Sequence, residues 1–194
     1  MNYLKERIIK DGKVFPNNVL KVDSFLNHQI DPAVVNAVEK LMYEHFKDRK
    51  ITKVMTIEAS GIAPAIMVAN RFNVPMLFAK KTEPSTLKKQ ERYHAMVHSY
   101  TKNTDSDVIV SKQYLSANDH VLIIDDFLAN GEAAKGLVSI AHQAGATVAG
   151  VGIVIEKSFQ PGRQLLEEMG IDVYSICRIQ SLENGQVTFV DGND

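Results

Sequence analysis

Two adjacent carboxylates, Asp125 and Asp126, directly follow the apolar run at residues 121–124. A short loop that contains Gly131 comes next, and helical periodicity is expected from Glu132 onward. Ligands of open α/β sheets bind beyond the carboxyl ends of the strands, and the amides at a helix N-terminus attract a phosphate. Adjacent carboxylates there suit the two hydroxyls of a ribose, or a Mg²⁺ on a pyrophosphate held directly or through water. A plain strand–turn–helix unit gives the same spacing, so the pattern alone leaves both interpretations open.

The surrounding elements predict how these side chains are positioned. Strands are expected at residues 53–57, 74–79, 121–124 and 148–155, and helices at residues 3–9, 62–71 and 132–144. A further helix starts at Asp31-Pro32, since aspartate is a favoured N-cap and proline a favoured first helical residue. Apolar strands that alternate with amphipathic helices predict an α/β protein with a parallel sheet covered on both faces.

One long polar excursion interrupts this alternation. Residues 80–90 are polar and basic, and residues 94–100 and 108–114 resemble two strands around a turn at 103–105. An excursion of this length between parallel strands is typical of a mobile loop or a functional lid.

Composition excludes several classes of protein. The chain has 194 residues, 45% hydrophobic and 23% charged, and a net charge of −1, which predicts one globular domain without nucleic-acid or membrane partners. We expect a cytoplasmic enzyme or binding protein, because no secretory leader and no apolar run of about 18 residues is found. The single cysteine, Cys177, is expected to be a small buried hydrophobe. His94 and His98 are expected to be a solvated pair rather than a zinc site.

The string from residue 121 to residue 134 resembles the PRPP-binding motif of type I phosphoribosyltransferases, where PRPP is phosphoribosyl pyrophosphate. The resemblance covers essentially the whole chain, and it is closest to bacterial xanthine phosphoribosyltransferases through residues 20–30, 57–64 and 155–162. It implies that family's fold: a parallel sheet flanked by helices, with a small hood and a flexible lid. The hood would comprise approximately residues 1–35 and 156–194, the core approximately 36–155, and the lid roughly 82–107.

The resemblance also implies roles for individual residues. The catalytic pair, Asp125 and Asp126, would face the ribose hydroxyls. Backbone amides would wrap the 5′-phosphate at Leu128, Ala129, Asn130, Gly131 and Glu132. The pyrophosphate loop would comprise Ala59, Ser60, Gly61 and Lys81, with Lys81 favoured over Lys80 because it is nearer the lid. Mg²⁺ would bind mainly through the pyrophosphate, so no protein ligand is assigned to it.

Recognition of the base is implied for four further residues. Lys157 would donate to the 6-oxo group of a purine, because an ammonium has donors and no acceptor. Asn27 would donate to the 2-oxo group of xanthine, but the same amide, flipped, would accept from guanine, so Asn27 alone does not decide the base. Leu20 would contact the ring, and Phe127 would pack on the purine or simply in the core. Ala129 stands where hypoxanthine-guanine enzymes place an aspartate, which removes the obvious general acid or base.

The implied activity is transfer of the phosphoribosyl group from PRPP to xanthine, with Mg²⁺, in a homodimer. One alternative is a hypoxanthine-guanine phosphoribosyltransferase, against which Ala129 and the string at residues 20–30 argue. Another is a regulator that senses PRPP without turnover. Such regulators carry an additional N-terminal DNA-binding domain, whereas this chain starts almost directly at the hood and has no basic patch.

Overall fold

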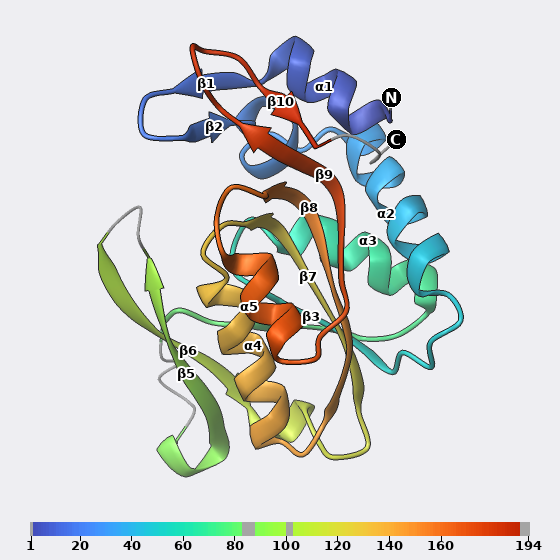
Figure 1. Ribbon diagram of the computed structural model, residues 1–194. Coiled ribbons are helices and arrows are strands. Elements are labelled where there is room, and N and C mark those ends of the chain that lie inside the picture. The colour runs from blue at the N-terminus through green and yellow to red at the C-terminus, as the bar shows by residue number, and fades with distance from the viewer. Residues whose placement is uncertain (1, 83–87, 100–102, 191–194) are drawn as a thin grey trace.

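The computed structural model describes residues 2–82, 88–99 and 103–190 (Figure 1). A six-stranded sheet with the order β10-β9-β8-β7-β3-β4 forms its centre. All neighbouring strands pair in parallel except the edge strand β10, which is antiparallel to β9. The predicted parallel sheet is therefore confirmed. Its strands are β3 (Lys53–Ile57), β4 (Met76–Ala79), β7 (His120–Leu128), β8 (Thr147–Lys157), β9 (Val173–Ser181) and β10 (Thr188–Phe189).

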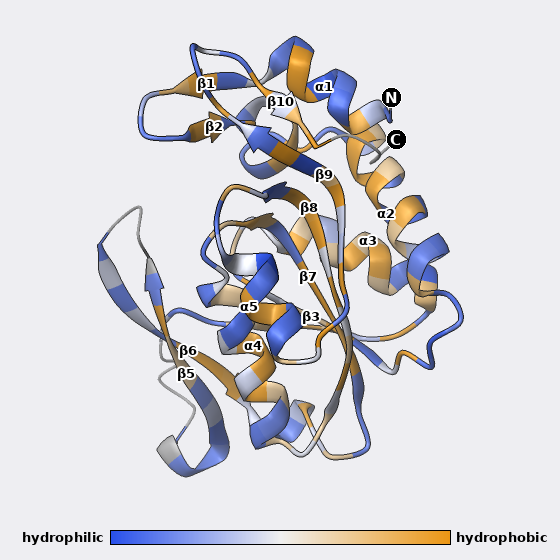
Figure 2. Ribbon diagram, in the orientation of Figure 1, coloured by the Kyte–Doolittle hydropathy of each residue, from blue (hydrophilic) through white to orange (hydrophobic). Residues whose placement is uncertain are grey.

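Helices cover both faces of this sheet, because successive strand residues point to opposite sides. Leu122 and Ile124 of β7 pack with α2 (Pro32–Phe46) and α3 (Ile62–Phe72) in one hydrophobic cluster. The intervening Ile123 packs with α4 (Glu132–Gln143) and α5 (Gly162–Glu168) in the other cluster. In Figure 2, β7 and β8 are mainly hydrophobic along their length, and the end of β8 that points toward the top of the molecule is hydrophilic. β7 carries its two acids, Asp125 and Asp126, just before its own end. The sheet therefore presents its polar edge there.

Local signals set the helix boundaries. The Asp31 side chain accepts a hydrogen bond from the amide of Ala33 at 2.9 Å, and Pro32 follows at the first helical position, as predicted. α3 ends at Asn73, whose φ of 54° lies in the left-handed region that closes many helices. α4 begins after Gly131, which has a φ of 85° that favours glycine.

Residues from both ends of the chain form a cap over the polar edge of the sheet, and we call this cap the hood (Figure 1). It contains α1 (Tyr3–Asp11), the hairpin of β1 (Lys13–Phe15) and β2 (Val19–Lys21), a π-helical turn, η1 (Asp23–Asn27), and β10. The Asn2 side chain donates to the carbonyl of Ile176 at 3.1 Å, which joins the start of α1 to β9. Leu4 and Ile8 share one hydrophobic cluster with residues of α2, so the hood core is continuous with one face of the sheet.

The polar excursion forms a second, antiparallel hairpin of β5 (Arg92–Ser99) and β6 (Thr104–Ser111). The predicted turn at 103–105 and the predicted strand at 108–114 had the wrong bounds. Thr104 and Asp105 already belong to β6, and the segment after β6 is a 3₁₀ turn, η3 (Lys112–Tyr114). Another 3₁₀ turn, η2 (Lys89–Glu91), precedes β5. The hairpin packs on α4, where a side chain at Gly136 would lie 2.6 Å from Val97 Cγ2. Parts of the predicted lid, residues 83–87 and 100–102, lie outside the described residues, as does the end of the predicted strand at Tyr100.

The two lid histidines pair with carboxylates across this hairpin. His94 Nδ1 lies 2.9 Å from Asp107, and His98 Nδ1 lies 2.7 Å from Asp105. Within the described ranges, no three or more histidine, cysteine or acidic side chains form a group that would hold a metal. In the same part of the chain, no helix has the length and apolarity needed to cross a membrane.

Candidate functional site

The two predicted catalytic acids lie at the polar edge of the sheet, on β7. Asp125 is 5% exposed and Asp126 is 7% exposed. The amide of Asp126 donates to Asp125 Oδ1 at 2.9 Å. The sequence predicted that the strand ends at residue 124 and that the acids follow it. In the structure β7 continues to Leu128, so both acids are part of the strand. Pairing with β8 continues past them through Phe127 and Leu128, and this pairing keeps the segment extended.

The pKa of Asp125 is raised well above its ordinary value. Burial is the largest cause, and the neighbouring charge of Asp126 adds to it, while the positive charge of Lys81 acts in the opposite direction. A buried pair of acids is unfavourable when both are ionised, unless cations or hydrogen-bond donors approach it. The pair is therefore suited to ligands that supply such groups, as hydroxyls and metal ions do.

The predicted pyrophosphate loop lies beside these acids. A Cβ atom at Gly61 would lie 2.1 Å from Thr56 Oγ1 and 3.0 Å from Asp125 Oδ1, so only glycine fits between the loop and the acid. The Glu58 carboxylate accepts a hydrogen bond from the amide of Lys81 at 2.7 Å, which ties the end of β4 to this loop. Ala59 and Ser60 retain solvent exposure, and the peptide bond between Glu58 and Ala59 is cis.

The predicted phosphate loop is closed by a backbone contact with the start of α5. The amide of Gly162 donates to the carbonyl of Ala129 at 3.0 Å. A Cβ at Gly162 would lie 2.4 Å from that carbonyl oxygen, and a Cβ at Gly131 would lie 3.0 Å from Gly162 Cα. Gly162 was not predicted as a site residue, although it ends one of the family-like strings. The two glycines thus fix the loop at the N-terminus of α4.

The remaining residues predicted in this loop have different environments. Leu128 is 2% exposed and packs in a hydrophobic cluster, so only its backbone is available to a ligand. Asn130 and Glu132 are partly exposed, and the Glu132 carboxylate lies 3.2 Å from Lys135 Nζ in the first turn of α4. Backbone amides and the partly exposed amide side chain of Asn130 are thus the groups that this loop offers to an anion.

Three predicted base-site residues lie close to one another at the same edge. Lys157 is the last residue of β8, and its ammonium lies 5.8 Å from the centre of the Phe127 ring. The Asn27 amide of the hood donates to Asp126 Oδ2 at 3.4 Å. Burial lowers the pKa of Lys157. Contacts therefore link the hood, the acid pair and the ends of two parallel strands.

Leu20 differs from the other predicted base-site residues. It is 7% exposed and packs in the hydrophobic cluster of the hood, which includes Leu4 and Ile8. Its contact with a purine ring stays a prediction.

A buried acid that was not predicted, Glu156, directly precedes Lys157 and is 1% exposed. Arg163 Nε lies 2.9 Å from its carboxylate and Arg178 Nε lies 3.2 Å from it, and Ser158 donates at 2.6 Å. Burial acts to raise the pKa of Glu156, but the hydrogen bond from Arg163, together with those from Ser158 and Ser175, lowers it to about 2. This network joins β8, α5 and β9.

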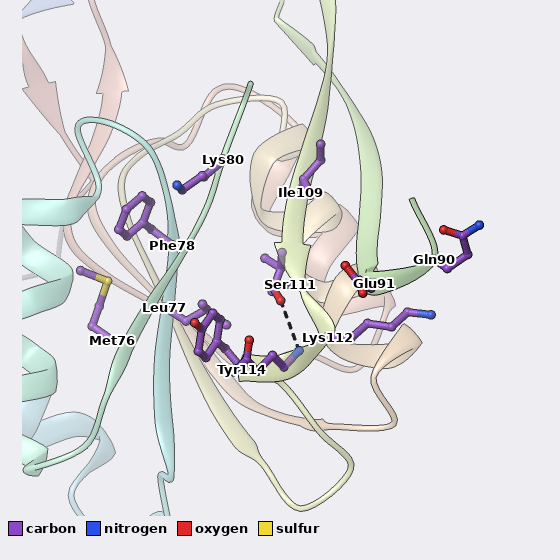
Figure 3. Close-up of a pocket in the computed structure, with 12 residues that line it drawn as sticks. Met76, Leu77, Phe78, Lys80, Gln90, Glu91, Ile109, Ser111, Lys112 and Tyr114 are labelled. Carbon is purple, nitrogen blue, oxygen red and sulfur yellow. Dashed lines mark hydrogen bonds between the residues drawn. The ribbon is translucent and has the colours of Figure 1, made fainter. Parts of the chain in front are cut away.

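A cavity of about 740 Å³ lies between β4 and the β5–β6 hairpin (Figure 3). None of the predicted site residues lines it, whereas Lys80 does. The backbone of Lys80 pairs with Ile109 of β6 through two hydrogen bonds of 2.9 Å. The backbone of Lys80 thus bonds to the hairpin, whereas the amide of Lys81 bonds to the loop beside the acids.

Comparison with known proteins gives one consistent family. The model of the phosphoribosyl transferase domain matches residues 26–180. A curated xanthine phosphoribosyltransferase of Macrococcus caseolyticus is 60% identical over 98% of this chain and 97% of its own length. The protein of that name from Staphylococcus saprophyticus is 59% identical over 98% of each chain.

The solved structures that match support the fold. Adenine phosphoribosyltransferase of Giardia lamblia has a TM-score of 0.76 at 22% identity, covering 92% of this chain and 98% of the other. The enzyme of Rhodothermus marinus has a TM-score of 0.74 at 21% identity, covering 90% and 98%. At such identities the likeness extends to the architecture only.

Proposed function

Because this chain belongs to the phosphoribosyltransferase family, within its xanthine phosphoribosyltransferases, we propose that it transfers the 5-phosphoribosyl group from PRPP to xanthine. The products are xanthosine 5′-monophosphate and pyrophosphate, and the reaction serves purine salvage. The observation that carries this proposal is the identity of 60% over 98% of the chain to a protein of that name. The buried acid pair beside a glycine-closed phosphate loop is consistent with it.

Binding of PRPP is assigned to the edge of the sheet formed by β3 and β7. Asp125 and Asp126 accept hydrogen bonds from the ribose hydroxyls. The 5′-phosphate lies in the loop from Leu128 to Glu132, where amides near the N-terminus of α4 face it. The pyrophosphate lies against Ala59, Ser60 and Gly61, and Lys81 neutralises part of its charge. This assignment is supported by the close approach of Gly61 to Asp125.

Mg²⁺ fits this site only together with the substrate. Mg²⁺ prefers oxygen ligands, and the acid pair offers carboxylate oxygens in a position where burial disfavours two negative charges. Because the described residues contain no group of three or more potential ligands, the ion would be held by Asp125 or Asp126 with pyrophosphate oxygens and water. When bound, the ion neutralises charge on the departing pyrophosphate.

Selection of the base is assigned to Lys157 and Asn27. The ammonium of Lys157 donates to the 6-oxo group and would lose this partner with adenine, so the site disfavours an amino group there. Asn27 donates to the 2-oxo group of xanthine, Leu20 lies toward the ring, and Phe127 packs against it. With alanine at position 129, rate acceleration rests on positioning, on Mg²⁺ and on stabilisation of the leaving pyrophosphate.

Four broader assignments complete the proposal. The chain is one domain, with a hood of approximately residues 1–35 and the part of 156–194 that follows β9, on a core that includes α5 and β9. The segment from 82 to 107 acts as a lid that excludes water from an oxocarbenium-like transition state. The enzyme works as a homodimer and acts in the cytoplasm.

The test is to follow nucleotide formation from PRPP and Mg²⁺ with xanthine, guanine, hypoxanthine and adenine in parallel. We expect the largest kcat/KM with xanthine and the smallest with adenine. A preference for guanine or hypoxanthine would retain the class of reaction and refute the base assignment. PRPP binding without turnover on any base would instead identify a PRPP-sensing regulator. The double variant D125N/D126N is the inactive control.

A further inference from the structure

The tip of the hood hairpin holds the ammonium of Lys157. Lys157 Nζ donates to the backbone carbonyl of Asn18 at 2.8 Å, and this bond joins residues that are 139 positions apart in the chain. Asn18 lies in the turn between β1 and β2, and Lys157 ends β8. The contact therefore spans the boundary between the hood and the polar edge of the sheet.

The conformation of this turn fixes the direction of the Asn18 carbonyl. Asn17 and Asn18 both have positive φ angles, of 62° and 59°. Asparagine tolerates this left-handed region, whereas β-branched residues are strongly disfavoured there. The flanking strands pair in register, with Phe15 opposite Val19 and Val14 opposite Leu20. The carbonyl is thus presented by a defined turn on a paired hairpin.

The bond to Asn18 also restricts where Lys157 can direct its other hydrogen atoms. An ammonium has three donors, and one of them is used by Asn18. The ammonium also lies over the Phe127 ring, 5.8 Å from its centre, where the π face stabilises the cation. Lys157 is half-buried, and burial lowers its pKa, so the ammonium depends on nearby partners more than a solvated lysine does. In the part of the chain that the structure describes, Asn18 is the one hydrogen-bond acceptor of Lys157, so two donors are left for a ligand.

We propose that Asn18 is a positioning residue, whose backbone carbonyl orients Lys157 toward the 6-oxo group of the purine and thereby sets the preference for oxopurines. This inference rests on the proposed function. The carbonyl acts on the base only through Lys157, so its loss should weaken binding of the purine and leave binding of PRPP unchanged. A turn that merely closes the hairpin would affect both substrates alike.

The test uses two substitutions at the same position. Asn18→Gly keeps the left-handed conformation and should leave the KM for xanthine within about twofold of the parent value. Asn18→Val opposes that conformation and should move the carbonyl, raising the KM for xanthine about tenfold while the KM for PRPP stays constant. Asn18→Ala is a milder variant of the same kind, which serves if the valine protein does not fold. An unchanged or lower KM for xanthine in the variant tested would overturn the proposal.

A matched control separates this effect from general loosening of the hood. Asn184 also has a positive φ, of 52°, and lies in the turn between β9 and β10 of the hood. Asn184→Val should reduce thermal stability about as much as Asn18→Val does, with no selective change in the KM for xanthine. If both variants change the two KM values in the same way, Asn18 has no role in positioning.

A double-mutant cycle links the effect to Lys157 itself. In a Lys157→Met background, Asn18→Val should change the KM for xanthine by less than about twofold, because the group that it positions is absent. Additive effects would mean that Asn18 acts by another route and would refute the proposal. Failure of the proposed function is recognised separately, since the parent enzyme would then show no turnover of xanthine.

Discussion

Two buried acidic sites lie on neighbouring parallel strands, and they differ in their hydrogen-bond partners and in the direction of their pKa shifts. Glu156 on β8 is surrounded by Arg163, Arg178 and two serines, and its pKa is lowered to about 2. The Asp125–Asp126 carboxylates on β7 accept hydrogen bonds from the Asp126 amide and from Asn27, and burial together with the neighbouring charge of Asp126 raises the pKa of Asp125. Similar burial thus accompanies opposite shifts of pKa.

We infer from this difference that the two sites have different roles. Glu156 is a buried carboxylate paired with arginines of α5 and β9, and removing it would leave those partly buried charges uncompensated. A carboxylate pair with few internal partners costs stability in the free protein and gains its partners from a ligand. The contrast distinguishes an acid paired inside the protein from acids that are proposed to bind a ligand, without reference to any relative.

The largest expected effect is on activity, when the Asp125–Asp126 pair is altered. Asp125→Asn removes a buried charge while keeping an oxygen that accepts the amide hydrogen of Asp126. We expect kcat/KM to fall on the order of 1000-fold, because an acceptor for the ribose is weakened, while the melting temperature is unchanged or higher. Steady-state kinetics and thermal unfolding measure the two quantities. A large loss of stability would show that the acid pair also supports the fold.

The next effect concerns the structural acid. Glu156→Gln leaves Arg163 and Arg178 without their anion, so the free energy of unfolding should fall by about 3 kcal/mol. Denaturant titration measures this loss. Glu44→Gln is the matched control, because Glu44 forms an exposed pair with Lys47 and its loss should leave the free energy of unfolding essentially unchanged. Equal losses in both variants would contradict the contrast between the two buried sites.

The smallest expected effect is the dependence of stability on pH that the depressed pKa of Glu156 produces. The pKa of Glu156 is about 2 in the folded protein and 4.5 in an ordinary environment, so the unfolded chain binds the proton first as the pH falls. The stabilisation by Glu156 is fully present above pH 4.5 and is lost as the pH falls toward 2, which amounts to about 2 kcal/mol after solvent screening. Between pH 4.5 and pH 2, the free energy of unfolding should fall more steeply with decreasing pH for the parent protein than for Glu156→Gln. Parallel curves would refute the depressed pKa.

The sequence predicts the central elements well, because their signals are local. β3 has the predicted bounds of 53–57, and α4 starts at Glu132 as predicted and ends one residue early, at Gln143. The predicted end of β7 at residue 124 was wrong, since polarity at Asp125 interrupts the apolar run while strand pairing continues to Leu128. The predicted burial of Cys177 is confirmed.

The contacts that assemble the site could not be predicted from local patterns. The bond between Lys157 and Asn18, and that between Asn27 and Asp126, join positions 139 and 99 residues apart. The network around Glu156 was likewise missed, since its two arginines are separate in the sequence and carry no periodic signal. Such pairings depend on how the hood lies over the sheet, which no single segment encodes.

The reactivity of the buried Cys177 thiol can report separation of β9 from the start of the chain. It is the only cysteine in the chain, it is fully buried, and its Sγ lies 3.6 Å from Asn2 Oδ1 at the contact between the chain start and β9. Burial raises the pKa of this thiol to about 12, so the folded protein holds almost no reactive thiolate near neutral pH. Alkylation by a thiol reagent therefore counts only molecules in which β9 has separated from the start of the chain, and its rate follows that opening without any added label.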